Sequence, residues 1–63
     1  MVKDDLSIED LDALPDDAVV LDRDNDSWQK YADEWYAYGE NPLMHEELLE
    51  WGPIALVWEG ENG

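Results

Sequence analysis

Apolar residues along this chain recur at spacings that predict short helices and short strands. Ser7, with an acidic residue three positions later, is typical of a helix N-cap, and Ile8, Leu11 and Leu14 then share one helical face. Pro15 follows and ends this segment, because proline cannot continue a helix. A short helix is therefore predicted near the N-terminus.

A second helix is predicted over residues 43–51. The Asn-Pro pair at 41–42 offers an N-cap followed by proline at the first helical position. Met44, Leu48 and Trp51 then follow an i, i+4, i+7 spacing and form one apolar stripe. A Gly-Pro pair comes directly after them and predicts the end of the helix.

Four other segments are predicted to be strands, because they are rich in β-branched and aromatic residues and are separated by turn-forming residues. These segments are 18–22, 27–31, 34–38 and 54–58. In the last of them, Ile54, Leu56 and Trp58 lie on one face and Ala55 and Val57 on the other. Both faces of this strand are therefore expected to be partly covered.

This order of elements predicts an α+β fold. We expect a small twisted antiparallel β-sheet of about four strands, with a short N-terminal helix and a second helix before the last strand. A sheet that curls into a small open barrel is the alternative arrangement, and the strand order is left open. The whole chain, 1–63, is expected to be a single small domain, ordered over 6–60 and frayed at both ends.

The charge of the chain is its most distinctive property. It has 18 Asp and Glu residues against three Lys and Arg, a formal net charge of −15. A folded domain of this length measures roughly 27 Å across, and about 26 Å of B-DNA carries the same number of charges. The folded protein would therefore match a DNA segment of its own size. Direct binding to nucleic acid or to an anionic membrane is disfavoured, since phosphate contacts need cations that the chain hardly has.

The cysteine count and the hydropathy bound the class of protein further. The sequence contains no cysteine, which excludes disulfides and thiolate metal sites. No apolar run reaches membrane-spanning length, and the acidic N-terminus lacks the apolar stretch of a signal peptide. We therefore expect a cytoplasmic protein.

Candidate metal and catalytic residues are few. The alternating acids of residues 22–26 are like the start of a Ca²⁺ loop, but the required glycine and glutamate are missing, so a hairpin turn is predicted instead. His45, the only histidine, has Leu48 and Leu49 at the positions that would share its helical face, so a surface role is expected rather than metal binding. No catalytic residue, metal or cofactor is expected, and so small a domain is not expected to be an enzyme.

The aromatic residues divide into two sets. All four tryptophans are expected to lie in the core: Trp28, Trp35, Trp51 and Trp58. Tyr36 and Tyr38 fall on the strand face opposite Trp35, where they would be half exposed. Together with Tyr31 they form a candidate patch for a protein partner, because rigid aromatic side chains are efficient interface anchors.

Several short motifs occur in a characteristic order: LDALP at 11–15, VVLD at 19–22, WQ at 28–29 and ELLEWGP at 47–53. This pattern resembles a family of small acidic β-rich proteins of actinobacteria and their phages. The resemblance covers roughly residues 8–60 and implies a small β-rich fold and a phage or actinobacterial setting, with the host cytoplasm as the compartment. The family has no assigned activity, so no functional residues carry over. Asn25 replaces the family's turn glycine, and Asp16 and Asp17 replace smaller residues.

Two functions from different classes fit this sequence, beside a third reading in which the acids only provide a solvated or salt-adapted surface. In the first, carboxylates imitate phosphates and bind a basic host protein, itself nucleic-acid-binding, so that the chain acts as an inhibitor by DNA mimicry. The carboxylates most apt to act together are Asp22, Asp24, Asp26, Glu46, Glu47 and Glu50. In the alternative, Tyr36 and Tyr38 anchor a protein–protein interaction, and the acidity serves solubility.

Overall fold

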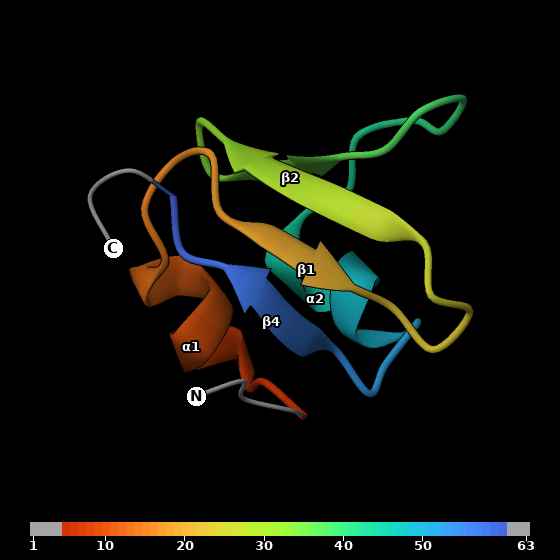
Figure 1. The fold of residues 1–63 in the computed structure, drawn as a ribbon, viewed down its shortest axis with the longest axis horizontal. Helices are drawn as coiled ribbons and strands as arrows, with labels where there is room; N and C mark the ends of the chain where they lie inside the picture. The colour runs from red at the N-terminus through yellow and green to blue at the C-terminus, as the bar shows by residue number, and fades with distance from the viewer. Residues whose placement is uncertain (1–4, 61–63) are drawn as a thin grey trace.

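The computed structural model describes residues 5–60, in which two short helices pack beside a four-stranded antiparallel sheet (Figure 1). The elements are α1 (Ile8–Ala13), β1 (Val19–Leu21), β2 (Ser27–Tyr31), β3 (Glu34–Tyr36), α2 (His45–Leu49) and β4 (Ala55–Trp58). The strands lie in the order β3-β2-β1-β4, so β3 and β4 are the edges of an open sheet. The predicted α+β class is confirmed, and the sheet is open rather than closed into a barrel.

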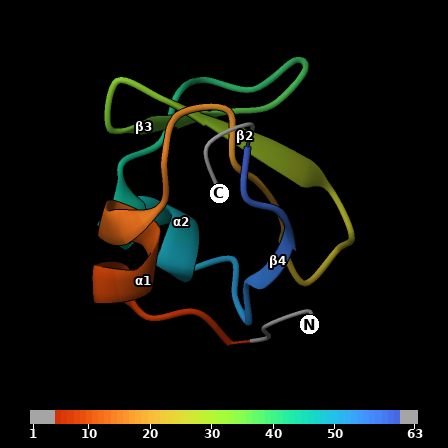
Figure 2. The same cartoon turned by 60° about the vertical axis from the view of Figure 1, so that its left-hand side comes forward.

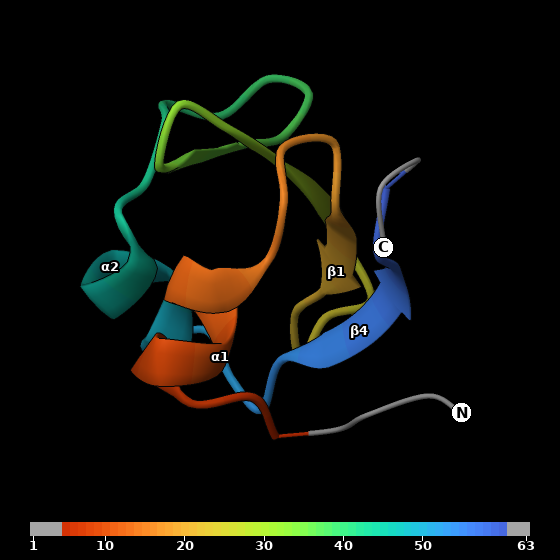
Figure 3. The same ribbon diagram turned by 90° about the vertical axis from the view of Figure 1, so that its left-hand side faces the viewer.

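Both helices lie on the same side of the sheet. Figures 2 and 3 show α1 and α2 next to each other, with β1 and β4 facing them. Among residues 5–60, no helix lies over the other side of the sheet, here called the outer face. Alternation directs Gln29 and Tyr31 of β2 to this outer face.

The core lies between the helices and the inner face of the sheet. Alternation along β2 directs Trp28 and Lys30 inward and Ser27, Gln29 and Tyr31 outward. The buried cluster consists of Leu6, Leu11, Val20, Trp28, Trp35, Leu48, Ile54 and Leu56. Every element contributes to this cluster, which explains how such short helices and strands hold one fold.

The prediction that all four tryptophans are buried is wrong for two of them. Trp51 and Trp58 are 42% and 48% exposed. β4 contains an irregularity in its pairing with β1: Val20 faces Leu56, but Val19 faces Trp58, so Val57 is an extra residue. This bulge moves Trp58 to the outer face, although simple alternation would bury it with Leu56.

Trp51 is exposed because α2 is shorter than expected. The helix begins at His45 and ends at Leu49, and the stripe of Met44, Leu48 and Trp51 does not form: only Leu48 is buried. The chain before the helix is extended, because Leu43 exchanges two backbone hydrogen bonds with Trp35 at 2.7 and 2.9 Å. This bridge covers the free edge of β3 and prevents the helix from starting at residue 42.

The predicted start of α1 is confirmed, since Ser7 forms a capping box.

The expectation of frayed termini concerns mainly residues 1–4 and 61–63, which lie outside the described residues. Gly60, the last residue expected to be ordered, is buried against the backbone that precedes β1. A Cβ atom at this position would lie 2.8 Å from the carbonyl oxygen of Asp16, and the φ angle of Gly60 is +86°. Only glycine fits both the space and this left-handed conformation.

Replacing Gly60 by alanine is therefore expected to lower the free energy of unfolding by about 1–3 kcal/mol. Gly39→Ala is the matched control, because Gly39 also has a positive φ, +78°, but nothing lies within 4 Å of its added Cβ. Urea unfolding followed by tryptophan fluorescence would compare the two variants. Equal losses in both would show that the packing of Gly60 on Asp16 contributes nothing.

Candidate protein-binding surface

Asp22 holds the β1–β2 turn from inside the protein. Its side chain is only 5% exposed, and its carboxylate accepts hydrogen bonds from the backbone N–H groups of Asp24 and Asp26 at 2.8 and 3.0 Å and from Trp28 Nε1 at 3.0 Å. Burial alone would raise the pKa of Asp22, but these hydrogen bonds, together with the Arg23 charge, outweigh it and lower the pKa below 3.8. Asp22 is therefore an ionised structural residue, and its predicted place on the binding surface is wrong.

Asp24 and Asp26 remain on the surface of this turn. Both are exposed, and a carboxylate oxygen of each comes within 4.8 Å of the others in the group with Asp22. Asn25 between them has a φ of +64°, which explains how it takes the place of a turn glycine. The hydrogen bonds within the turn account for the spacing of these acids, as expected for a hairpin turn rather than a Ca²⁺ loop.

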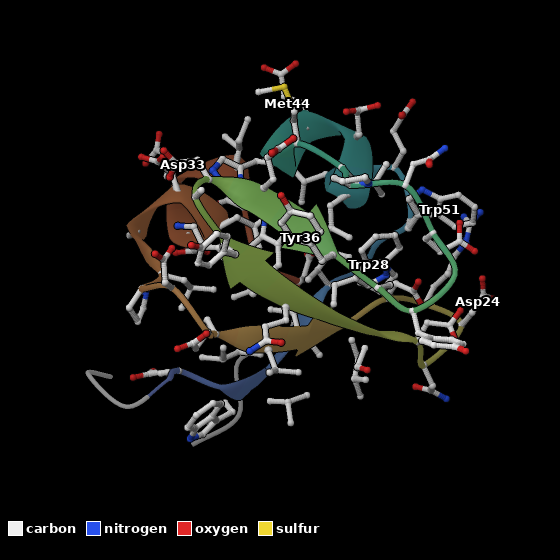
Figure 4. The ribbon with its side chains drawn as sticks, turned by 90° about the horizontal axis from the view of Figure 1, so that it is seen from above. Asp24, Trp28, Asp33, Tyr36, Met44 and Trp51 are labelled. Atoms are coloured by element: carbon white, nitrogen blue, oxygen red, sulfur yellow. The ribbon has the colours of Figure 1, made fainter. Side chains whose placement is uncertain are left out.

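Arg23 connects this turn to the end of α2. Its backbone N–H donates to the carbonyl oxygen of Trp51 at 2.9 Å, and its guanidinium carbon lies 5.9 Å from the centre of the Trp51 ring. Glu50, exposed at the C-cap of α2, is next to Trp51 in the chain. We call Asp24, Asp26 and Glu50 the turn carboxylates; Figure 4 shows Asp24 and Trp51, the chain neighbour of Glu50, at the same end of the molecule.

A second set of acids lies around the start of α2. Glu46 and Glu47 are exposed in its first turn, where the positive end of the helix dipole favours them, and Glu47 accepts a hydrogen bond from the backbone of Met44 at 3.1 Å. Asp12 and Asp33 come within 4.8 Å of His45, the first residue of the helix. Glu46, Glu47, Asp12 and Asp33 are called the helix-start carboxylates, and Figure 4 shows Asp33 at the end opposite Asp24.

His45 is not the surface residue that its position in the sequence suggests. Its side chain is 13% exposed, and its Nδ1 accepts a hydrogen bond of 2.8 Å from the indole Nε1 of Trp35. The proton of a neutral His45 is therefore on Nε2, which lies 3.6 Å from Asp12 Oδ1. A metal at Nε2 would force that proton onto Nδ1, against the Trp35 N–H, so the geometry opposes metal binding by this histidine.

Lys30 is a buried cation that the sequence analysis did not single out. It is 2% exposed, and its Nζ donates to the carbonyl oxygens of Leu11, Asp12 and Leu14 at the C-terminal end of α1. The Leu11 carbonyl accepts only the C-cap N–H of Leu14, at 3.3 Å, and all three carbonyls lie at the negative end of the helix dipole, so an ammonium group is favoured there. The inward position of Lys30 follows from its spacing with Trp28, which was the available signal.

The surface is consequently almost purely anionic. Every acidic residue from 5 to 60 is exposed except Asp10, Asp22 and Glu34, and Arg23 is the one exposed basic residue in the same range. The principal-axis extents are 26 × 22 × 19 Å. A duplex of the longest of these lengths carries about 15 phosphates, which matches the formal net charge of −15 for the whole chain.

The exposed aromatic residues do not form the single patch that was expected. Tyr31 and Tyr36 lie together on the outer face, with ring centres 6.5 Å apart in a T-shaped arrangement. Tyr38 lies beyond the end of β3, fully exposed, where it lines a different hollow with Asp26 and Ser27. Trp58 is the exposed aromatic of β4. The alternative interface therefore contains Tyr36 with Tyr31 rather than Tyr36 with Tyr38.

Comparisons with known proteins found no relative of this chain. No protein-family model matches the chain, and no match was found among curated proteins or solved structures. The resemblance to small actinobacterial and phage proteins therefore stays a prediction. Within residues 5–60, neither helix has the length and apolar character needed to cross a bilayer.

Proposed function

We propose that this chain is a non-enzymatic acidic binding protein that occupies the nucleic-acid-binding groove of a basic protein. Its carboxylates stand in for the phosphates of a duplex, so the partner is blocked or sequestered. In the setting that the sequence motifs suggest, the chain is phage-encoded and the partner is a host protein in the cytoplasm. That setting is an inference from resemblance and not from geometry.

The observation that carries this proposal is the separation of the charges between surface and interior. The acids face solvent, whereas Lys30 is turned inward onto the end of α1. A surface that needed only solubility would gain it from mixed charges of modest net value. A nearly uniform negative field instead steers a basic partner toward the protein and repels nucleic acid and other acidic molecules.

The arrangement of the acids on a rigid frame also favours mimicry. The turn carboxylates and the helix-start carboxylates lie at opposite ends of α2, which has five residues and thus a length of about 7.5 Å. Several carboxylates on one folded backbone can meet several basic side chains at once. Their backbone positions are already ordered in the free protein, which lowers the entropy cost of binding.

A second candidate function is a protein–protein interaction through the outer face. The exposed fractions of Tyr31, Tyr36 and Trp58 are 61%, 39% and 48%, and neither helix within residues 5–60 covers them. In that case the acidity would serve solubility, and affinity would hold at high salt. Mimicry predicts the opposite, because exposed charge pairs are screened.

The experiment is affinity capture from an actinobacterial lysate, with elution by a salt gradient or by excess duplex DNA. We expect a basic nucleic-acid-binding protein to elute under both conditions. The triple variant of the turn carboxylates, Asp24→Asn, Asp26→Asn and Glu50→Gln, should bind it about tenfold more weakly at low salt. Tyr38→Ala, which leaves the charge unchanged, is the control. Retention of the partner in high salt, with loss of binding in an outer-face variant, would favour the second function.

A further inference from the structure

The outer face of the sheet contains a shallow hollow of about 390 Å³. It is lined by Asp17, Gln29, Tyr31 and Tyr36. The registers place Gln29 opposite Tyr36 and opposite Val19, so the hollow lies over β2 and the edge strand β3. Its four lining residues are all exposed, and no helix of residues 5–60 lies over this face. Figure 4 shows Tyr36 on the strand that faces the viewer.

The two tyrosine rings make the apolar walls of the hollow. Their planes are inclined by 64°, with the centres 6.5 Å apart. The hydroxyl of Tyr36 donates to Glu34 Oε1 at 3.2 Å, which fixes the position of this ring. Desolvation, followed by the negative charge of Glu34 and the hydrogen bond to it, raises the pKa of Tyr36, so its phenol is neutral and can donate at physiological pH.

Asp17 supplies a carboxylate at the rim. Its backbone N–H donates to the carbonyl oxygen of Lys30 at 2.8 Å, and its φ angle of +74° directs the chain around this corner. Oδ1 of Asp17 accepts a hydrogen bond of 3.3 Å from Gln29 Nε2, so one face of the carboxylate is oriented by the sheet. The only cation in this part of the chain, Lys30, is buried on the inner face. The hollow is therefore both aromatic and negatively charged.

We propose that this hollow receives an arginine side chain of the protein partner; the inference rests on the proposed function. A guanidinium is planar and weakly hydrated, so it can stack on a tyrosine ring while its N–H groups donate to the carboxylate of Asp17. A lysine ammonium is a compact, strongly hydrated charge that fits the aromatic walls less well. The hollow repels phosphates. Arginine recognition thus adds selectivity to the charge-driven encounter.

The test compares two peptides of equal charge, nona-arginine and nona-lysine, by calorimetric titration at one fixed ionic strength. We expect the arginine peptide to bind about threefold or more tightly. The ring protons of Tyr31 and Tyr36 should shift in NMR spectra with the arginine peptide and much less with the lysine peptide. Equal affinities and equal shifts would overturn the arginine site and leave charge-driven binding standing. Failure of both peptides to bind at low salt would overturn the proposed function as well.

Two variants locate the effect. Tyr31→Leu with Tyr36→Leu keeps both exposed positions apolar and should abolish the preference for arginine. Asp17→Asn removes one negative charge. Asparagine keeps the side-chain oxygen that accepts the hydrogen bond from Gln29, and it tolerates the positive φ of this position. The matched control is Glu9→Gln, which removes one exposed charge on α1, on the other side of the sheet. If both variants weaken arginine binding equally, Asp17 has no special role and the proposed site is wrong.

Discussion

Replacing Lys30 by methionine is expected to destabilise the protein more than any surface change. Methionine keeps the apolar stem of the side chain but leaves the carbonyl oxygens of Leu11, Asp12 and Leu14 without their shared donor. Losing hydrogen bonds to a charged donor at a buried helix end costs about 3 kcal/mol. A domain of this size has a free energy of unfolding of roughly 3–9 kcal/mol, so the variant would lose about a third or more of its stability.

Urea unfolding monitored by circular dichroism measures this effect. Arg23→Met is the matched control, since it removes the same charge from an exposed side chain and is expected to cost about 1 kcal/mol or less. A similar small loss in both variants would mean that the Lys30 ammonium does not hold the end of α1. Because both variants become equally more acidic, the comparison separates this contact from general charge repulsion.

Asp22→Asn is also expected to have a large effect, about 2 kcal/mol of lost stability. Asparagine can still accept the two backbone hydrogen bonds of the turn through its single oxygen. Its amide nitrogen, however, would face the indole N–H of Trp28, and two donors cannot bond to each other. Asp24→Asn, a neighbouring exposed position, is the control and should stay within about 0.5 kcal/mol of the original protein.

The difference between the original protein and Asp22→Asn should also depend on pH in one direction. The pKa of Asp22 is lowered in the folded state, so its ionised form contributes stability at pH values above the unfolded pKa of about 3.9. That contribution is lost as the pH falls through the lower folded-state pKa. Unfolding curves at several pH values should show a constant difference above about pH 5 and a shrinking one below about pH 4. A difference independent of pH would contradict the assigned role of the Asp22 carboxylate.

Local patterns in the sequence predicted most of the fold, because the elements are short and each has its own signal. The alternation of 27–31 gave a strand with the observed bounds, and the capping pattern at Ser7 gave the start of α1. The second helix was predicted too long at both ends, and its start was wrong because Leu43 follows its long-range pairing with Trp35 and not its local propensity. Trp58 was misplaced because a bulge in a strand pairing leaves no mark in a single sequence.

The candidate surface was predictable only in part. The turn at 22–26 and the exposed acids of α2 follow from composition and turn chemistry, so Asp24, Asp26, Glu46, Glu47 and Glu50 lie on the surface as expected. The burial of Asp22 depends on Trp28, six residues away, whose indole N–H needs an acceptor. The low exposure of His45 likewise goes with its hydrogen bond from Trp35, which lies in β3. Such contacts between distant residues decide which acids and histidines are structural.

The central claim, that carboxylates on this protein replace the phosphates of a duplex, is tested most directly by the affinity for the captured partner. That affinity should be measured over about 50–200 mM salt, with and without competing duplex DNA. We predict a steep linear fall of the logarithm of affinity with the logarithm of salt concentration, and mutually exclusive binding of this protein and DNA. An affinity that is constant over this range, or a partner that binds both at once, would contradict mimicry.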